Sequence, residues 1–166
     1  MYQCAVDLLY FRCLEITVYT DGSCHTQLLI GAWVCIVFIG ENRIDLSGVV
    51  TDTTHNRMEL VAVIESLKFI KAEYPNAVVV IFTDSQYVVG LRDRRNKIQS
   101  AAFTTKAGNE IQNVDLVREL WSIEDELQVN FIKVAAHLKK TDKVNHNLEA
   151  DRIVRGLLRK AVAAVS

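Results

Sequence analysis

The chain from Leu14 to Thr51 consists of three extended, largely apolar runs separated by polar segments. The separating segments, Asp21-Gly22-Ser23 and Gly40-Glu41-Asn42, contain residues that favour turns. Extended runs joined by short turns form an antiparallel meander. We therefore predict three antiparallel strands, over Ile16–Asp21, Ala32–Ile39 and Arg43–Thr51.

A helical pattern follows, from Asn56 to Tyr74, in a stretch without Gly or Pro. Its apolar residues recur at helical spacing, and Pro75 ends it. The next segment, Ala77–Thr83, is an unbroken apolar run, which is typical of a strand covered on both faces. Because this strand is reached through a helix, we expect it to be parallel to an earlier strand.

The remainder of the chain predicts further alternation of helices and strands. The predicted segments are a short helix over Asp84–Leu91, an irregular polar segment over Arg92–Gln112, a helix over Asn113–Leu127, a strand over Val129–Ala135 and a closing helix over Leu148–Val165. The element order βββαβααβα predicts an α/β fold with a mixed five-stranded sheet. Residues 1–166 are expected to form one domain, with 1–12 as an N-terminal extension.

Composition agrees with a globular chain, because half of the residues are apolar and 23% are charged. The net charge of −1 does not by itself indicate a polyanionic partner, so any basic surface must be local. Three local clusters of cations occur: Arg92, Arg94, Arg95 and Lys97; Lys133, Lys139, Lys140 and Lys143; and Arg152, Arg155, Arg159 and Lys160.

Other sequence signals favour a cytoplasmic protein without a membrane segment. The apolar start, Met1–Phe11, lacks a basic leader region and is too short to span a bilayer. The four cysteines contain no C-x-x-C pair, so neither a zinc site nor a redox dithiol is indicated. We expect a monomer.

Asp21 and Asp84 each follow a predicted strand. Considered singly, Asp21 is typical of a turn and Asp84 of a helix cap. Both nevertheless fall toward the carboxyl ends of two strands that we expect to be parallel neighbours, which is where open α/β sheets bind ligands. Their position therefore favours a functional role.

Glu59 and Asp151 belong to predicted helices. Glu59 could be the capping partner of Asn56, but its helical phase is that of Val63 and Leu67, which directs the carboxylate toward the sheet. A lone inward charge would be costly. Asp151 lies at the margin of the apolar stripe of the closing helix, where a solvated carboxylate would also be unremarkable.

If these carboxylates converge in one crevice, they repel each other, and bound cations are the effective means of relieving that repulsion. A ligand set made only of oxygen atoms favours Mg²⁺ or Mn²⁺ over zinc.

Several segments together closely resemble the catalytic segments of type 1 ribonuclease H, in that family's order and spacing from about Leu14 to about Leu158. They are Tyr19-Thr20-Asp21-Gly22-Ser23, Asn56-Arg57-Met58-Glu59-Leu60, Thr83-Asp84-Ser85-Gln86-Tyr87-Val88, Asn113-Val114-Asp115-Leu116 and Asn147-Leu148-Glu149-Ala150-Asp151.

The resemblance implies a ribonuclease H-like sheet of order 3-2-1-4-5 with helices on both faces. It also implies that Asp21, Glu59, Asp84 and Asp151 are the catalytic, metal-binding quartet. The implied activity is hydrolysis of the RNA strand of RNA–DNA hybrids by two Mg²⁺ ions, with Mn²⁺ as a substitute, leaving 5′-phosphate and 3′-hydroxyl ends.

Further residues match functional positions of the family. His137 matches a catalytic histidine thought to help with proton or product movement. Thr54, Asn56, Gln86 and Asn147 are the expected substrate-binding residues. Contacts to phosphate and to the minor groove suit a hybrid, whose wide, shallow groove displays 2′-hydroxyls on one strand only.

Three segments depart from the family's pattern, and one of them is the long stretch Leu138–His146 between His137 and Asn147. Residues Cys24–Ile30 replace a loop that is commonly rich in Gly and Pro, and the segment Arg92–Gln112, which matches the basic binding protrusion, contains no Trp. Two alternative functions are a nuclease of the same superfamily acting on DNA and a non-catalytic hybrid-binding domain. The presence of all four carboxylates argues against the second alternative.

Overall fold

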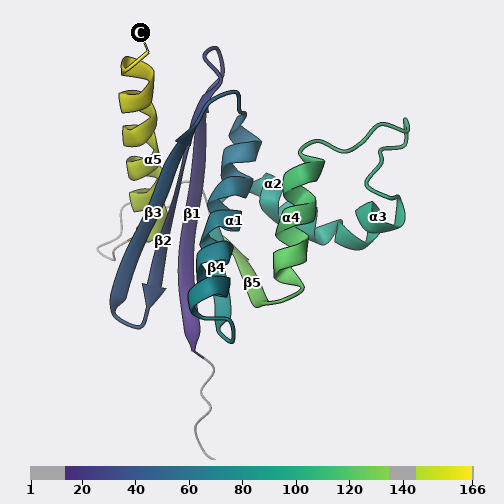
Figure 1. Ribbon diagram of the computed structural model, residues 1–166, viewed down its shortest axis with the longest axis horizontal. Coiled ribbons are helices and arrows are strands. Elements are labelled where there is room, and N and C mark those ends of the chain that lie inside the picture. Colours follow the sequence, from purple (N-terminus) through teal and green to yellow (C-terminus); the bar gives the residue numbers. More distant parts are fainter. Residues whose placement is uncertain (1–13, 135–144, 166) are drawn as a thin grey trace, which may run out of the picture.

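One mixed sheet of five strands organises the chain, and its strand order is β3-β2-β1-β4-β5 (Figure 1). The structure, a computed structural model, describes residues 14–134 and 145–165. The strands are β1 Glu15–His25, β2 Ile30–Ile39, β3 Asn42–Val50, β4 Val78–Thr83 and β5 Gln128–Lys133. β1, β2 and β3 are antiparallel, whereas β4 is parallel to β1 and β5 is parallel to β4. The predicted mixed sheet and its order are confirmed.

Helices cover both faces of this sheet (Figure 1). They are α1 His55–Glu73, α2 Gln86–Asp93, α3 Arg95–Ser100, α4 Val114–Glu124 and α5 His146–Ala163. α1 packs on β1 and β2 and contacts α4, and α5 packs on the opposite face against β1, β2 and β3. Among the described residues, no helix combines the length and apolarity needed to cross a membrane.

Two apolar clusters hold these layers together. The larger cluster lies between the sheet and α1 and α4, and it includes Ile16, Leu67, Val79 and Trp121. The smaller cluster lies under α5, where Val34 and Ile36 of β2 meet Val154. Because β1 and β2 contribute to both clusters, they form the buried centre of the sheet. The predicted N-terminal extension, residues 1–12, lies outside the described residues.

The predicted turn at Asp21-Gly22-Ser23 is wrong, because these residues lie inside β1 and pair with Val34, Trp33 and Ala32 of β2. The glycine serves a different purpose from turning the chain. A Cβ atom on Gly22 would lie 2.4 Å from the backbone nitrogen of Glu59 and 2.4 Å from the carbonyl carbon of Met58. Gly22 therefore lets the backbone of α1 approach β1 closely.

The short helix α3 lies in the segment that we predicted to be irregular. Its sequence contains one buried apolar residue, Ile98, and no side-chain cap, so the local pattern gives no helical signal. Tertiary contacts hold it instead. Arg95 lies over the Trp121 ring and forms ion pairs with Glu124 and Asp125.

The contact at Gly22 predicts a large penalty for a single methyl group. We expect Gly22→Ala to lower the free energy of unfolding by about 1–3 kcal/mol or more, because α1 must move away from β1. Gly156→Ala is the matched control, since a Cβ there meets nothing within 4 Å. That change should stabilise α5 by about 0.5–1 kcal/mol. Urea unfolding of both variants measures this, and equal stabilities would contradict the close approach.

Candidate active site

The register between β1 and β4 aligns two of the predicted carboxylates. The last parallel pair is Tyr19 with Phe82, and the same register carried two residues further places Asp21 level with Asp84. β4 ends at Thr83, whereas β1 continues to His25 beside β2. The two carboxylates therefore lie where β1 and β4 part, as expected for a ligand crevice in an α/β sheet.

α1 brings Glu59 to the same place. Thr54 caps this helix by accepting a hydrogen bond from the backbone N–H of Arg57, so Glu59 is not part of the capping arrangement considered from sequence. Glu59 is 9% exposed, and its Oε2 atom is buried without a hydrogen-bond partner. Its Oε1 atom lies 3.0 Å from Nε2 of His55, one turn earlier on the helix.

Asp84 is free of a capping role. Ser85 caps α2 instead, because its Oγ atom accepts a hydrogen bond of 3.2 Å from the backbone N–H of Val88. Within 14–134 and 145–165 no residue forms a hydrogen bond or an ion pair with the Asp84 side chain. Its oxygens are therefore available to a ligand.

α5 supplies Asp151 from the other face of the sheet. Asn145 caps this helix and accepts hydrogen bonds from the N–H groups of Asn147 and Leu148 at 3.1 and 3.3 Å. Asp151 lies in the second turn, and its Oδ1 atom accepts a hydrogen bond of 2.6 Å from Nε of Arg155. Asn147, which is buried, has an Oδ1 atom without a partner in the described structure.

These side chains line one cavity of about 450 Å³. The predicted site residues that it brings together are Asp21, Glu59, Asp84, Asp151, Asn56, Gln86 and Asn147. Thr54 lies outside it and lines an adjoining hollow, which Asn56 also lines. His137 lies outside the described residues.

The electrostatics of the cavity are repulsive. Burial raises the pKa of Asp21 to about 7, and the neighbouring negative charge of Asp84 adds to this effect. A hydrogen bond of 2.8 Å from the backbone N–H of Gly22 acts in the opposite direction, while Asp151 and Glu59 raise the pKa further. The hydrogen bond with Glu59 raises the pKa of His55. The other three carboxylates therefore all disfavour the ionised form of Asp21.

The donor set suits hard divalent cations. The ligands would all be carboxylate oxygens, which Mg²⁺ and Mn²⁺ prefer, and the orphaned Oε2 of Glu59 needs a positive partner. Among the described residues, however, no three acidic, His or Cys side chains are close enough together to form a ready metal cluster. Two of the carboxylates instead contact side chains of the protein, Glu59 with His55 and Asp151 with Arg155.

His55 and Arg155 also line the cavity, although neither was predicted as a site residue. The available signal was spacing, because His55 precedes Glu59 by four residues and Arg155 follows Asp151 by four. Residues four apart on a helix are neighbours on its surface.

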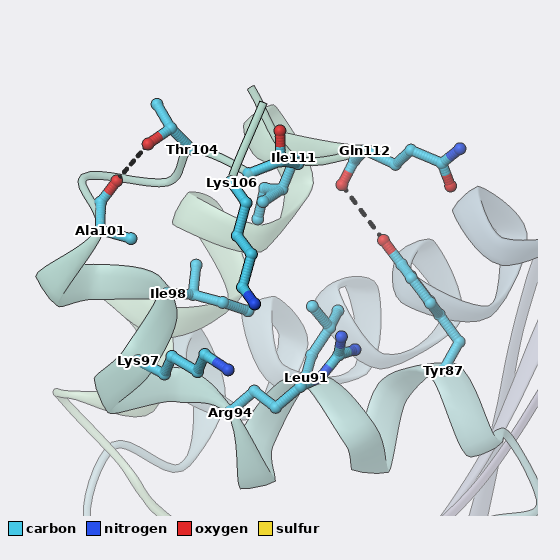
Figure 2. A pocket seen from close by; sticks show the side chains of 11 residues that line it. Tyr87, Leu91, Arg94, Lys97, Ile98, Ala101, Thr104, Lys106, Ile111 and Gln112 are labelled. Carbon is cyan, nitrogen blue, oxygen red and sulfur yellow. Dashed lines mark hydrogen bonds between the residues drawn. The ribbon is translucent and has the colours of Figure 1, made fainter. Parts of the chain in front are cut away.

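A second hollow, of about 460 Å³, adjoins the candidate site beyond Tyr87, which lines both (Figure 2). α2, α3 and residues 101–112 enclose it, with Leu91, Ile98 and Ile111 as apolar lining. Its cations are Arg94, Lys97 and Lys106, and Figure 2 shows the amino groups of both lysines directed toward the hollow. The segment Arg92–Gln112, which contains no Trp, thus still presents cations beside an apolar surface.

A polar network connects the two hollows. Arg57 of α1 forms two hydrogen bonds with Asp115 of α4, at 3.0 and 2.7 Å. The Tyr87 hydroxyl donates to the carbonyl oxygen of Gln112 at 3.2 Å and accepts from the side chain of Asn113 at 3.0 Å. Arg57 also donates a hydrogen bond of 3.5 Å to Oδ1 of Asn113, which links the two groups. This network, which we call the α1–α2–α4 network, joins the starts of three helices around the site.

Comparison with known proteins identifies the family. The family model for RNase H matches residues 14–158. Ribonuclease H of Caldicellulosiruptor saccharolyticus is 34% identical over 148 residues, which cover 88% of this chain and 97% of that protein. Ribonuclease H of Wolbachia sp. subsp. Drosophila simulans is 33% identical over 142 residues, covering 85% of this chain and 93% of that protein.

A solved structure supports the fold. It is that of LC9-RNase H1, described as a type 1 RNase H with the type 2 active-site motif. The TM-score is 0.76 with 23% sequence identity, and the match covers 91% of this chain and 75% of that chain. Together with the extent of the sequence matches, this likeness leads to one conclusion: the chain belongs to the ribonuclease H family of endoribonucleases.

Proposed function

We propose that this protein is a metal-dependent endonuclease that hydrolyses the RNA strand of RNA–DNA hybrids and leaves 5′-phosphate and 3′-hydroxyl ends. The observation that carries the proposal is the cavity in which Asp21, Glu59, Asp84 and Asp151 meet, in a chain of the ribonuclease H family. Each of the four comes from a different element, so their convergence is a property of the fold.

The four carboxylates would hold two Mg²⁺ ions, with Mn²⁺ as a substitute. When bound, such ions supply Lewis-acid activation of the attacking water and stabilisation of the departing 3′ oxygen. The protein's own part is to present oxygen ligands from fixed backbone positions. Gly22 sets the separation of α1 and β1, and the parallel register sets that of Asp21 and Asp84.

Side chains at the edge of the cavity would position the hybrid. Asn56, Gln86 and Asn147 carry amide groups that both donate and accept, as recognition of 2′-hydroxyls and base edges requires. The hydroxyl oxygen of Thr54 already accepts a hydrogen bond from the Arg57 N–H, which leaves its own proton free to donate to a phosphate. None of these groups needs a particular base, so binding would be independent of sequence.

His137 completes the proposed machinery. It would accept or deliver a proton, or help the product to leave, as its match to the family's histidine implies. His146, near the start of α5, is an unsuitable substitute, because its ring packs against Tyr19 and Phe38 and its Nδ1 lies 3.1 Å from Glu149.

The second hollow would bind the backbone of the hybrid. Arg94, Lys97 and Lys106 present three cations at one place, and no acidic residue lines the hollow. Cations neutralise phosphates without reading bases, and this contribution to affinity weakens as salt concentration rises.

We further propose that the protein acts as a monomer in the cytoplasm.

One cleavage assay tests both the substrate and the metal requirement. Labelled RNA–DNA hybrid should be cut in the RNA strand only when Mg²⁺ or Mn²⁺ is present, whereas DNA duplex and RNA duplex should remain intact. Asp84→Asn should reduce the rate by about a thousandfold or more, since metal catalysis stabilises the transition state by several kcal/mol. Its metal-free fold should be at least as stable as that of the parent, because one repelling charge is gone. Equal cleavage of DNA duplex would instead indicate a DNA nuclease.

The raised pKa of Asp21 makes stability depend on pH, because this pKa is about 7 in the folded protein and 3.8 for a free aspartate side chain. Between these pH values the folded state binds a proton that the unfolded state releases. Without metal, stability should therefore fall as pH rises from about 4 to about 7, by a few kcal/mol. Below this range the effect is absent, and above it the full penalty remains.

Chemical denaturation in EDTA of the parent and of Asp21→Asn isolates this contribution as the difference between their free energies of unfolding. That difference should change across the stated pH range in EDTA and change less when Mg²⁺ is added. If the free energies of unfolding of the parent and of Asp21→Asn change in parallel with pH in EDTA, the pKa of Asp21 is not raised in the folded protein.

Lysine variants test whether the second hollow binds the hybrid. Lys97→Ala and Lys106→Ala should each weaken hybrid binding and reduce the slope of log affinity against log salt by about one. The rate with saturating substrate should change little, because neither residue reaches the carboxylates. Lys160→Ala, near the end of α5, is a control of equal charge. If all three variants share one salt dependence, the hollow does not bind the backbone.

A further inference from the structure

Arg155 is a permanent cation placed at the edge of a site that we propose to hold metal. Its Nε atom donates to Oδ1 of Asp151 at 2.6 Å, and its side chain lines the cavity with the four carboxylates. The guanidinium remains charged at every working pH, so Arg155 can pair with the ionised carboxylate of Asp151 over that whole range.

The contact occupies an atom that a metal would need. A carboxylate binds hard cations through its oxygens, and one of the two Asp151 oxygens is already taken by Arg155. The positive charge of Arg155 also offsets part of the negative charge of the four carboxylates that line the same cavity. Both effects oppose the binding of a divalent cation.

The pair is nevertheless easy to open. The side chain of Arg155 is 63% exposed and that of Asp151 is 37% exposed, so water replaces the lost hydrogen bond at little cost. The pair between His55 and Glu59 differs, because Glu59 is 10% exposed in its side chain. Of the two pairs, the one on α5 is therefore the more readily displaced.

We propose that Arg155 is a positioning residue that sets the metal affinity of the site. It holds Asp151 in the metal-free protein and releases Oδ1 when a cation binds, and its charge substitutes in part for the missing ion. This inference rests on the proposed function, because it requires that metal binds among the four carboxylates.

Isothermal titration calorimetry with Mn²⁺ and no substrate tests the proposal. Arg155→Ala should bind Mn²⁺ about two- to fivefold more tightly than the parent, which corresponds to the strength of an exposed ion pair. Arg155→Lys, which keeps the charge, should lie closer to the parent. Arg159→Ala is the matched control, because it removes the same charge from the same helix, one turn beyond Arg155, and should leave affinity nearly unchanged.

A double-mutant cycle identifies the route of the effect. In an Asp151→Asn background, which binds Mn²⁺ through the remaining carboxylates, adding Arg155→Ala should change affinity by less than it does in the parent. An equal gain in both backgrounds would mean that Arg155 acts through general charge, and the positioning role would be wrong.

The remaining outcomes separate the inference from the proposed function. If the parent binds Mn²⁺ and Arg155→Ala binds it with unchanged or weaker affinity, only the inference fails. If the parent binds no Mn²⁺, or if Asp84→Asn binds it as the parent does, the proposed metal site itself fails and the inference falls with it.

Discussion

The close approach of α1 to β1 at Gly22 is the constraint on which the site depends. Because a hydrogen atom replaces a side chain at this position, the backbone of Met58 and Glu59 lies against the strand that carries Asp21. The neighbouring glycine on β2 has a similar function, since a Cβ on Gly31 would lie 2.5 Å from the Met58 side chain. A wider gap would leave Glu59 remote from the other carboxylates.

Much of the fold follows from the sequence, because apolar patterning reports burial directly. The periodic run from Asn56 to Tyr74 correctly predicts a helix, and its phase correctly predicts that Glu59 is buried. The turn at Asp21-Gly22-Ser23 is wrong because a glycine needed for close packing has the same local appearance as one needed for a turn. α3 is missed because contacts of Arg95 with distant residues stabilise it.

The candidate site is predictable to a similar extent. Strand order and register bring Asp21 and Asp84 together, and helical phase accounts for Glu59, so backbone geometry alone accounts for these three. The contacts of His55 with Glu59 and of Arg155 with Asp151 depend on side-chain conformation. Apolar patterning predicts burial and gives no information about such conformations. The capping residues also cannot be predicted from the local sequence. Thr54, Ser85 and Asn145 each have polar neighbours that could cap the same helix. Only the coordinates identify which of them accept the helix N–H groups.

Two basic side chains at the edge of the cavity contact two of its carboxylates. The cavity gathers four carboxylates whose mutual repulsion opposes folding. Arg155 compensates Asp151, and protonation of His55 is favoured by its hydrogen bond with Glu59. Asp21 and Asp84 remain at the centre without a cationic side chain in contact among the described residues. The charge balance is thus partial, which preserves attraction for a ligand while limiting the loss of stability.

The α1–α2–α4 network has a consequence for the shape of what can bind. Arg57, Asp115 and Tyr87 anchor helix starts on both sides of the boundary between the carboxylate cavity and the cationic hollow. Hydrogen bonds between these helix starts hold the cavity and the hollow at a fixed separation. If both surfaces bind the hybrid as proposed, a duplex would engage them together only when its groove dimensions match that span, so the width of the duplex would contribute to selection.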